Sequence, residues 1–136
     1  MGALEAQNFT SATDSFNTAV GYTAGAAVTT GIQNTLIGGL AGDALTDADQ
    51  NVAIGYAALT SDTLGSKSVA IGREALVTQN FTSATDVYNV AVGHNAGQLI
   101  TTGVRNTLIG ALAGDGLTTG DNNVAVGMNA LSAETQ

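Results

Sequence analysis

Asn51-Val-Ala-Ile-Gly55 is one of seven copies of a five-residue pattern that decides the fold. In each copy a polar residue is followed by three small or branched residues and a glycine, and the copies begin at residues 17, 34, 51, 68, 89, 106 and 123. The interval between starts is 17, except for one step of 21. Self-similarity at a short, nearly fixed period indicates a repeat architecture, in which each unit stacks on its neighbours.

The repeated columns become clear when each unit is numbered from its first residue. Position one is Asn except at Ser68, position four is Val or Ile, position five is Gly and position eight is Ala. Stacked Asn side chains can bond each other and the local backbone, so we expect an Asn ladder along the stack. The repeated Asn and Gly residues are Asn17, Gly21, Asn34, Gly38, Asn51, Gly55, Gly72, Asn89, Gly93, Asn106, Gly110, Asn123 and Gly127.

Positions two to four form a short run of β-branched and small residues between Asn and Gly, which is typical of a strand bounded by turns. Frequent Gly, Asn and Thr disfavour a helix. A unit of this length allows two short strands and two bends, with successive coils paired in parallel about 4.8 Å apart, giving a rod roughly 35 Å long. The sequence therefore predicts an all-β fold, a parallel β-solenoid or β-roll that fills residues 1–136 as a single repeat domain.

A longer period lies on top of the short one. The segment Gln7–Asp14 recurs unchanged at Gln79–Asp86, and this offset of 72 equals three steps of 17 and one of 21. The polar stretch Asn80–Asp86 is predicted to bulge from an otherwise regular stack. Both ends interrupt the longer unit, which we call the superunit, and we therefore expect a segment of a longer array.

The alternation of side chains along a strand suggests which residues face inward. We assign positions two and four, with their branched aliphatic residues, to the interior of the coil. Positions three and five then lie on the opposite face, where Ala and Gly would allow another backbone to approach closely. Leu36 and Leu108 in column three would add apolar contact once per superunit. This face is the predicted interface of a homo-oligomer.

Composition and charge disfavour several classes of protein. The net charge is −8, with 11 acidic residues against Lys67, Arg73 and Arg105, whereas a nucleic-acid-binding protein needs clustered cations. No apolar run approaches the length of a membrane span, and we expect no membrane insertion. The chain has no cysteine for disulfides or thiolate metal sites.

Catalytic and metal-binding patterns are weak. His94 is the only histidine, and no nucleophile-elbow motif accompanies it, so we expect no enzyme and no cofactor. Calcium is the one alternative, since Ca²⁺ prefers loop carboxylates, but the calcium-binding roll motif is absent. The acids in the bends are Asp43, Asp47, Asp49, Asp115 and Asp121, for which solvated loop positions are the default interpretation.

Two copies of the pattern resemble a known family. Asn51-Val-Ala-Ile-Gly55 and Ser68-Val-Ala-Ile-Gly72, each with Ala three residues later, resemble the head repeat of trimeric autotransporter adhesins of the YadA type. The stretch at 17–25, with Thr-Thr-Gly at 29–31, is also similar to repeats in bacteriophage tail-fibre proteins. The resemblance covers nearly the whole chain. It implies a left-handed parallel β-roll, side by side or intertwined as a homotrimer, in a virion tail fibre or at a cell surface.

The same resemblance implies a rigid rod that presents a recognition surface to a host receptor or glycan. Residues that are outward and variable are the candidates for that surface. They are Tyr22, Tyr56, Arg73 and His94 from position six, and Phe9 and Phe81 from the polar loops. An inert shaft is the simpler interpretation of the same residues. The alternative function is a self-assembling extracellular filament whose subunits stack end to end.

Overall fold

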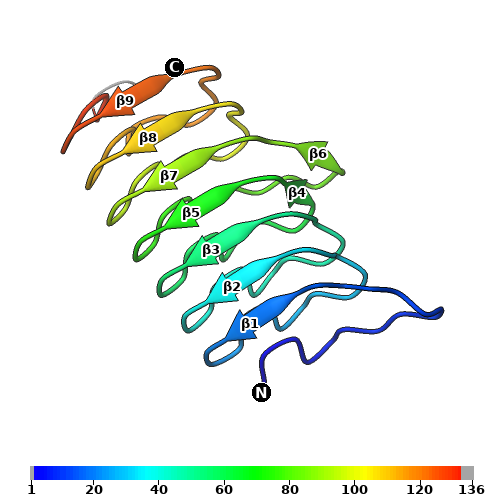
Figure 1. Cartoon of the computed structure of the whole chain (residues 1–136). Coiled ribbons are helices and arrows are strands. Elements are labelled where there is room, and N and C mark those ends of the chain that lie inside the picture. The colour runs from blue at the N-terminus through cyan, green and yellow to red at the C-terminus, as the bar shows by residue number, and fades with distance from the viewer. Residues whose placement is uncertain (1, 133–136) are drawn as a thin grey trace.

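The computed structural model describes residues 2–132, which form a β-solenoid without helices (Figure 1). Seven parallel strands, one from each coil, make a large sheet in the order β1-β2-β3-β5-β7-β8-β9, and β4 pairs with β6 in a small second sheet. The predicted all-β parallel solenoid is confirmed for these residues. The strands are β1 (Thr18–Val20), β2 (Thr35–Ile37), β3 (Val52–Ile54), β4 (Gly65–Ser66), β5 (Val69–Ile71), β6 (Thr85–Asp86), β7 (Val90–Val92), β8 (Thr107–Ile109) and β9 (Val124–Val126).

Every strand of the large sheet pairs with the equivalent residues of the next coil. Thr18 pairs with Thr35 across an ordinary step, and Val69 pairs with Val90 across the longer one. The extra residues therefore leave the register unchanged, and the bulge is confined to the far side of the coil. The expected second strand forms only where β4 meets β6. In the other described coils the back half consists of turns and bends.

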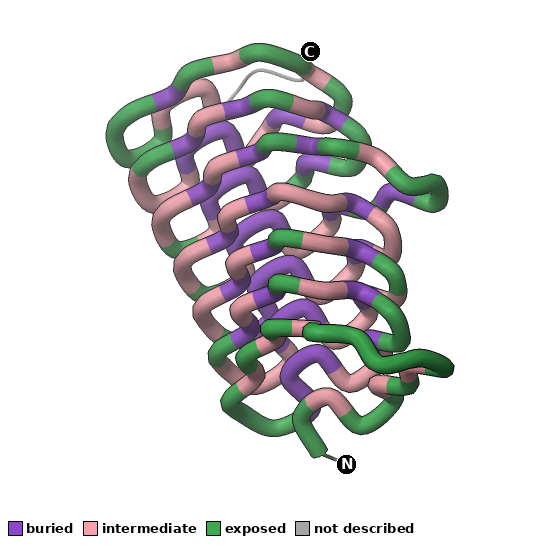
Figure 2. The backbone as a smooth tube through the Cα atoms, turned by 45° about the vertical axis from the view of Figure 1, so that its right-hand side comes forward, coloured by how far each residue is buried: buried purple, intermediate pink, exposed green. Residues whose placement is uncertain are grey.

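The face of the large sheet that points into the solenoid is the opposite of the one predicted from the sequence. Position three is buried from β2 onward, whereas position four points outward, with Ile37 37% and Val126 68% exposed. The assignment of positions two and four to the interior is therefore wrong. Leu36 and Leu108, expected to contact another chain, are fully buried inside their own coils. Buried residues recur at equivalent places in successive coils (Figure 2). The core consists mainly of alanines at positions three and eight and of aliphatic residues of the back half, so the interior is narrow.

The side chains at positions three and nine share one space in the core, so a large residue at one of these positions requires a small residue at the other. Where position three is Leu36, position nine is glycine in that coil and in the coil before it. A Cβ on Gly42 would lie 2.8 Å from Leu36 Cδ2, and one on Gly25 would lie 2.6 Å from Leu36 Cδ1. In the third coil position three is Ala53, and the fully buried Leu59 occupies position nine. Because protein interiors are close-packed, the narrow interior of each coil has room for only one large side chain at positions three and nine.

The Asn side chain at position one forms hydrogen bonds with the backbone at the bend where one coil passes into the next. Asn34 Oδ1 accepts the backbone N–H of Asn51 at 2.9 Å, and Asn34 Nδ2 donates to the carbonyl of Ala48 at 2.8 Å. The predicted Asn ladder is thus confirmed, mainly through backbone partners. The same two kinds of bond are made by Asn17, Asn51, Asn89 and Asn106.

A buried polar cluster replaces the ladder where Ser68, with its shorter side chain, stands at position one. Gln79 Nε2 donates to Asp62 at 2.6 Å and to Ser68 Oγ at 3.1 Å, while Gln79 Oε1 accepts from Asn89 Nδ2 at 2.8 Å. Asp62 is fully buried and also accepts two backbone N–H groups. Since buried carboxylates are stable only when they are hydrogen-bonded, this cluster stabilises the interior of the enlarged coil.

Glycine at position five marks the closest approach of successive coils. Gly55 has φ +134°, and a Cβ built on it would lie 2.5 Å from the carbonyl oxygen of Gly72. The same holds, at 2.4–2.6 Å, for the other glycines of this column that have a coil above them. The column does admit a neighbouring backbone, as expected, but that backbone belongs to the next coil of the same chain. The prediction that position three contacts another chain is wrong, because from β2 onward its residues are buried inside their own coils.

Candidate functional site

The outward side of the large sheet, which we call the front face, is uncharged throughout positions two and four. Position two carries Thr or Val, and position four carries Val or Ile. Several of these side chains are well exposed, for example Ile109 at 42% and Val124 at 71%. A contiguous apolar surface of this kind is typical of a protein interaction site. The front face consists of Thr18, Val20, Thr35, Ile37, Val52, Ile54, Val69, Ile71, Val90, Val92, Thr107, Ile109, Val124 and Val126.

Three of the position-six candidates lie together beside the front face. The guanidinium of Arg73 lies 5.9 Å from the ring centroid of Tyr56 and its Nη1 is 3.3 Å from His94 Nε2. Arg73 also forms an ion pair with Glu74, at 2.6 Å. Tyr22 stands apart, because Gly39 occupies position six between the first and third coils. The structure therefore gathers Tyr56, Arg73 and His94 into one exposed group and leaves Tyr22 at a separate place.

The two loop phenylalanines differ in exposure. Phe9 is half-buried. Phe81 is only 8% exposed, and its backbone N–H donates to the buried carboxylate of Asp62 at 3.0 Å. The expectation that Phe81 points outward is therefore wrong. The side chain is buried although it belongs to a bulge of mostly polar residues.

The second copy of the polar loop is tied to the preceding coil by a charged cluster. Lys67 Nζ lies 2.5 Å from Asp86 Oδ2, 3.3 Å from the Tyr88 hydroxyl and 5.3 Å from the centre of the Tyr88 ring. The hydrogen bond from Lys67 lowers the pKa of Asp86 below its ordinary value, and the same bond raises the pKa of Lys67. All three side chains lie at the surface, where such pairs contribute little to stability.

This cluster predicts a small pH dependence of stability. Since the folded-state pKa of Asp86 is lowered, its contribution is complete above the unfolded-state pKa and disappears as the pH falls through the folded value. The raised pKa of Lys67 makes its contribution disappear as the pH rises through the folded value. We expect Asp86→Asn to lower the melting temperature at neutral pH and to have no effect in strong acid. Melting curves followed by circular dichroism near both pH values measure this.

The control for this prediction is Asp14→Asn, at the equivalent position of the first superunit, where no lysine pairs with the carboxylate. It should leave the melting temperature unchanged at both pH values. An equal loss for Asp86→Asn in acid and at neutral pH would contradict the role given to the ion pair.

The acids in the bends serve mainly as hydrogen-bond acceptors between coils. Asp43 accepts from Thr60 and Asp47 accepts from Thr30, in each case one coil step away. Asp49 accepts the backbone N–H of Ile32 at 2.8 Å. Among residues 2–132, no group of three or more His, Cys, Asp or Glu is placed to hold a metal ion. Calcium binding stays the alternative that the sequence left open.

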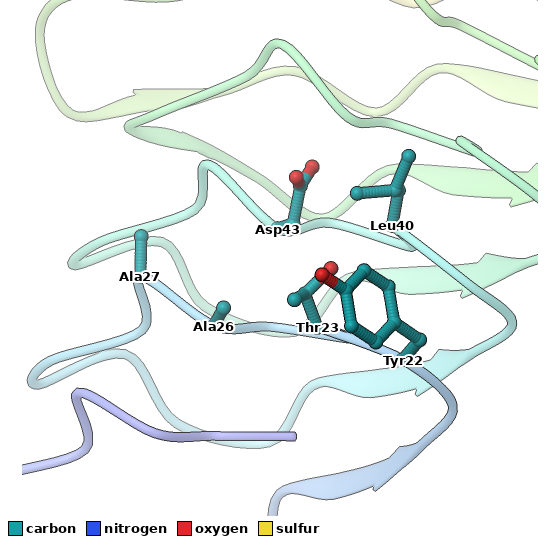
Figure 3. A pocket seen from close by; sticks show the side chains of 6 residues that line it. All are labelled: Tyr22, Thr23, Ala26, Ala27, Leu40 and Asp43. Carbon is teal, nitrogen blue, oxygen red and sulfur yellow. The ribbon is translucent and has the colours of Figure 1, made fainter. Parts of the chain in front are cut away.

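A cavity of about 360 Å³ lies between the first and second coils, in the turns that follow β1 and β2 (Figure 3). This site was not predicted, because its walls come from two coils and its two candidate residues, Tyr22 and Asp43, were considered for unrelated roles. The signal was a difference between superunits, since Gln98-Leu99 occupy in the second superunit the positions of Ala26-Ala27 in the first. The lining residues are Tyr22, Thr23, Ala26, Ala27, Leu40 and Asp43.

Comparison of the chain with protein-family models, with curated proteins and with solved structures gave no match. No helix long and apolar enough to cross a membrane occurs in residues 2–132.

Proposed function

We propose that this chain is a segment of a structural or adhesive fibre, a rigid rod that assembles as a homotrimer and presents a host-recognition surface. The observation that carries the proposal is the front face: seven strands of uncharged, mostly β-branched side chains, at the surface along the length of the stack. A soluble chain that leaves such a face open invites association. The resemblance to adhesin heads and tail fibres agrees with three chains arranged around an axis.

The front face would form the centre of an interface. Seven strands about 4.8 Å apart, each of three residues and so about 10 Å wide, cover roughly 340 Å². A standard specific interface buries about 800 Å² on each partner, so the turns beside the strands would supply the rest of the contact. The face is also rigid, since each strand is hydrogen-bonded to its neighbours in one unbroken register. Little conformational entropy is lost when a rigid surface of this kind is covered.

The recognition surface in this proposal is the group formed by Tyr56, Arg73 and His94. These side chains lie at the edge of the front face, so an assembly through that face leaves them at its border. They combine an aromatic ring, a cation and an imidazole, with Arg73 in contact with both Tyr56 and His94. Aromatic residues and Arg are common in binding hot spots, whereas the repeated columns have no such chemistry.

The test is the molar mass in solution, measured by light scattering after size exclusion. The unaltered chain should have three times the mass of one chain, and Ile71→Lys, on the central strand β5, should reduce it to the mass of one. Burying an unpaired lysine in an apolar interface is costly, so we expect a loss of affinity of at least about a hundredfold. A monomeric unaltered chain would overturn the proposal.

Thr119→Lys is the matched control, because it adds the same charge to an exposed residue in the back half of its coil. It should leave the trimer intact. Circular dichroism of both variants shows whether the fold persists. Continuous fibrils of the unaltered chain in negative-stain images would favour the filament alternative over discrete rods.

A further inference from the structure

The cavity between the first two coils combines a carboxylate, an aromatic ring and apolar walls. Asp43 contributes the only charged side chain of the lining, and one of its oxygens accepts from Thr60. The ring of Tyr22, 68% exposed, stands at one side, and the side chains of Leu40 and the two alanines form the rest (Figure 3). Its volume lies within the range of small-molecule sites.

Thr23 is an unusual residue in this wall. It is 5% exposed, and its Oγ1 has no hydrogen-bond partner among the described residues. Its φ is 52°, a left-handed conformation that β-branched residues rarely adopt. The same position in the other coils carries Leu40, Ala57, Glu74, Asn95, Leu112 and Asn129, none of which is β-branched. The Oγ1 atom is itself buried, so Thr23 forms part of the wall of the cavity and does not offer its hydroxyl to a ligand. A strained residue in the wall of a cavity is typical of a functional site.

The chemistry of the lining selects a class of ligand. An anion is disfavoured, because no cationic side chain lines the cavity and the chain has a net charge of −8. A neutral polyol would need many hydrogen-bond partners, and among the side chains of the lining only Asp43 and the Tyr22 hydroxyl are available. A cation is favoured by the carboxylate and by the face of the aromatic ring. The apolar walls suit an alkyl chain, and the Asp43 carboxylate suits a ligand that donates an N–H.

We propose that this cavity binds a primary or secondary alkylammonium group. The ammonium lies between the Tyr22 ring and the Asp43 carboxylate, to which it donates an N–H. The alkyl chain lies against Leu40, Ala26 and Ala27. A polyamine and a lysine side chain of another protein share this chemistry.

The second superunit provides a natural comparison within the same scaffold. The positions of Ala26 and Ala27 are occupied there by Gln98 and Leu99, and the acid is retained as Asp115. Two longer side chains thus stand where the first superunit leaves space. Replacing the two alanines by Gln and Leu therefore imports side chains that this backbone already carries one superunit later.

Calorimetric titration of the full chain tests the proposal with four small probes. n-Butylammonium should bind. The other three should each bind at least about tenfold more weakly, because butan-1-ol lacks the charge, butyrate has the opposite charge and tetramethylammonium cannot donate an N–H. Binding of butan-1-ol or tetramethylammonium as tight as that of n-butylammonium would overturn the proposal. So would the absence of heat with n-butylammonium up to high millimolar concentration.

Variants then place the bound probe. Asp43→Asn keeps an acceptor for Thr60 but removes the charge, and should weaken n-butylammonium binding at least about tenfold. The double variant Ala26→Gln, Ala27→Leu should abolish binding while the circular dichroism spectrum is unchanged. Asp115→Asn, the same change in the second superunit, should retain full affinity. Equal losses for Asp43→Asn and Asp115→Asn would show non-specific attraction to an acidic chain and would overturn the site.

Two further probes distinguish the sources of the ligand. Spermidine represents a free polyamine, and Nα-acetyl-lysine methylamide represents a protein side chain. The probe that competes better with n-butylammonium identifies the source, and competition by either one supports the site. Failure of both to displace n-butylammonium would overturn it.

Discussion

Gly55→Ala is expected to unfold much of the stack. An alanine at φ +134° is strained, and its Cβ would lie 2.5 Å from the carbonyl oxygen of Gly72 in the next coil. The neighbouring atom is backbone, which is held in the sheet and cannot move aside alone. We expect a loss of at least about 4 kcal/mol in the free energy of unfolding, a large part of the stability of a small domain. Urea denaturation followed by circular dichroism measures it.

Gly127→Ala separates the two causes. Gly127 has nearly the same conformation, at φ +123°, but no heavy atom lies within 4 Å of a Cβ built on it. Only the backbone strain applies, and the expected cost is about 1–3 kcal/mol. If both variants lost the same amount, the close approach of successive coils would not be what requires glycine in this column.

Leu36→Ala should cost about 2–5 kcal/mol, because it leaves a cavity in a fully buried level of the core. Gly42→Leu alone should also destabilise, since a Cβ at Gly42 already lies 2.8 Å from the Leu36 side chain. Together the two substitutions give the second coil the arrangement of the third, with alanine at position three and leucine at position nine. We expect the double variant to be more stable than the sum of the single losses predicts, by about 2 kcal/mol.

A double-mutant cycle from urea denaturation provides that number. The matched control pairs Leu108→Ala with Gly42→Leu, whose side chains belong to different superunits and should be additive within about 0.5 kcal/mol. If the losses in the free energy of unfolding for Leu36→Ala and Gly42→Leu were additive, positions three and nine would not share one space in the core.

The period, the strands and the bulge could be predicted because they depend on local patterns. Asn, or Ser68 before β5, and Gly bound each strand of the large sheet, and the offset between superunits locates the enlarged coil before residue 89. The orientation of the strands could not be predicted in the same way. Positions three and four are both apolar, so alternation divides the residues into two faces without showing which is inside. The width of the interior decides, and it admits Ala53 more readily than Ile54.

The candidate site was only partly predictable for a related reason. Exposure at position six follows from its variability, and Tyr22, Tyr56, Arg73 and His94 are indeed at the surface. Phe81 was misplaced, because its burial depends on the partners of Asp62 in the preceding coil. The cavity depends on two small residues in one turn beside Leu40 and Asp43 in the next. Contacts of this kind join residues that a single unit of the repeat does not contain.

The unchanged register across the enlarged coil has a consequence for variation of the chain. Val69 and Val90 pair as if the coil had its ordinary length, so extra residues enter at 80–86 without disturbing the sheet. The number of residues inserted at this point therefore does not affect how the coils stack. Loops of other sequences could be exchanged there at fixed intervals, four coil steps or about 19 Å apart along the axis. The scaffold can therefore stay constant while the displayed peptide changes.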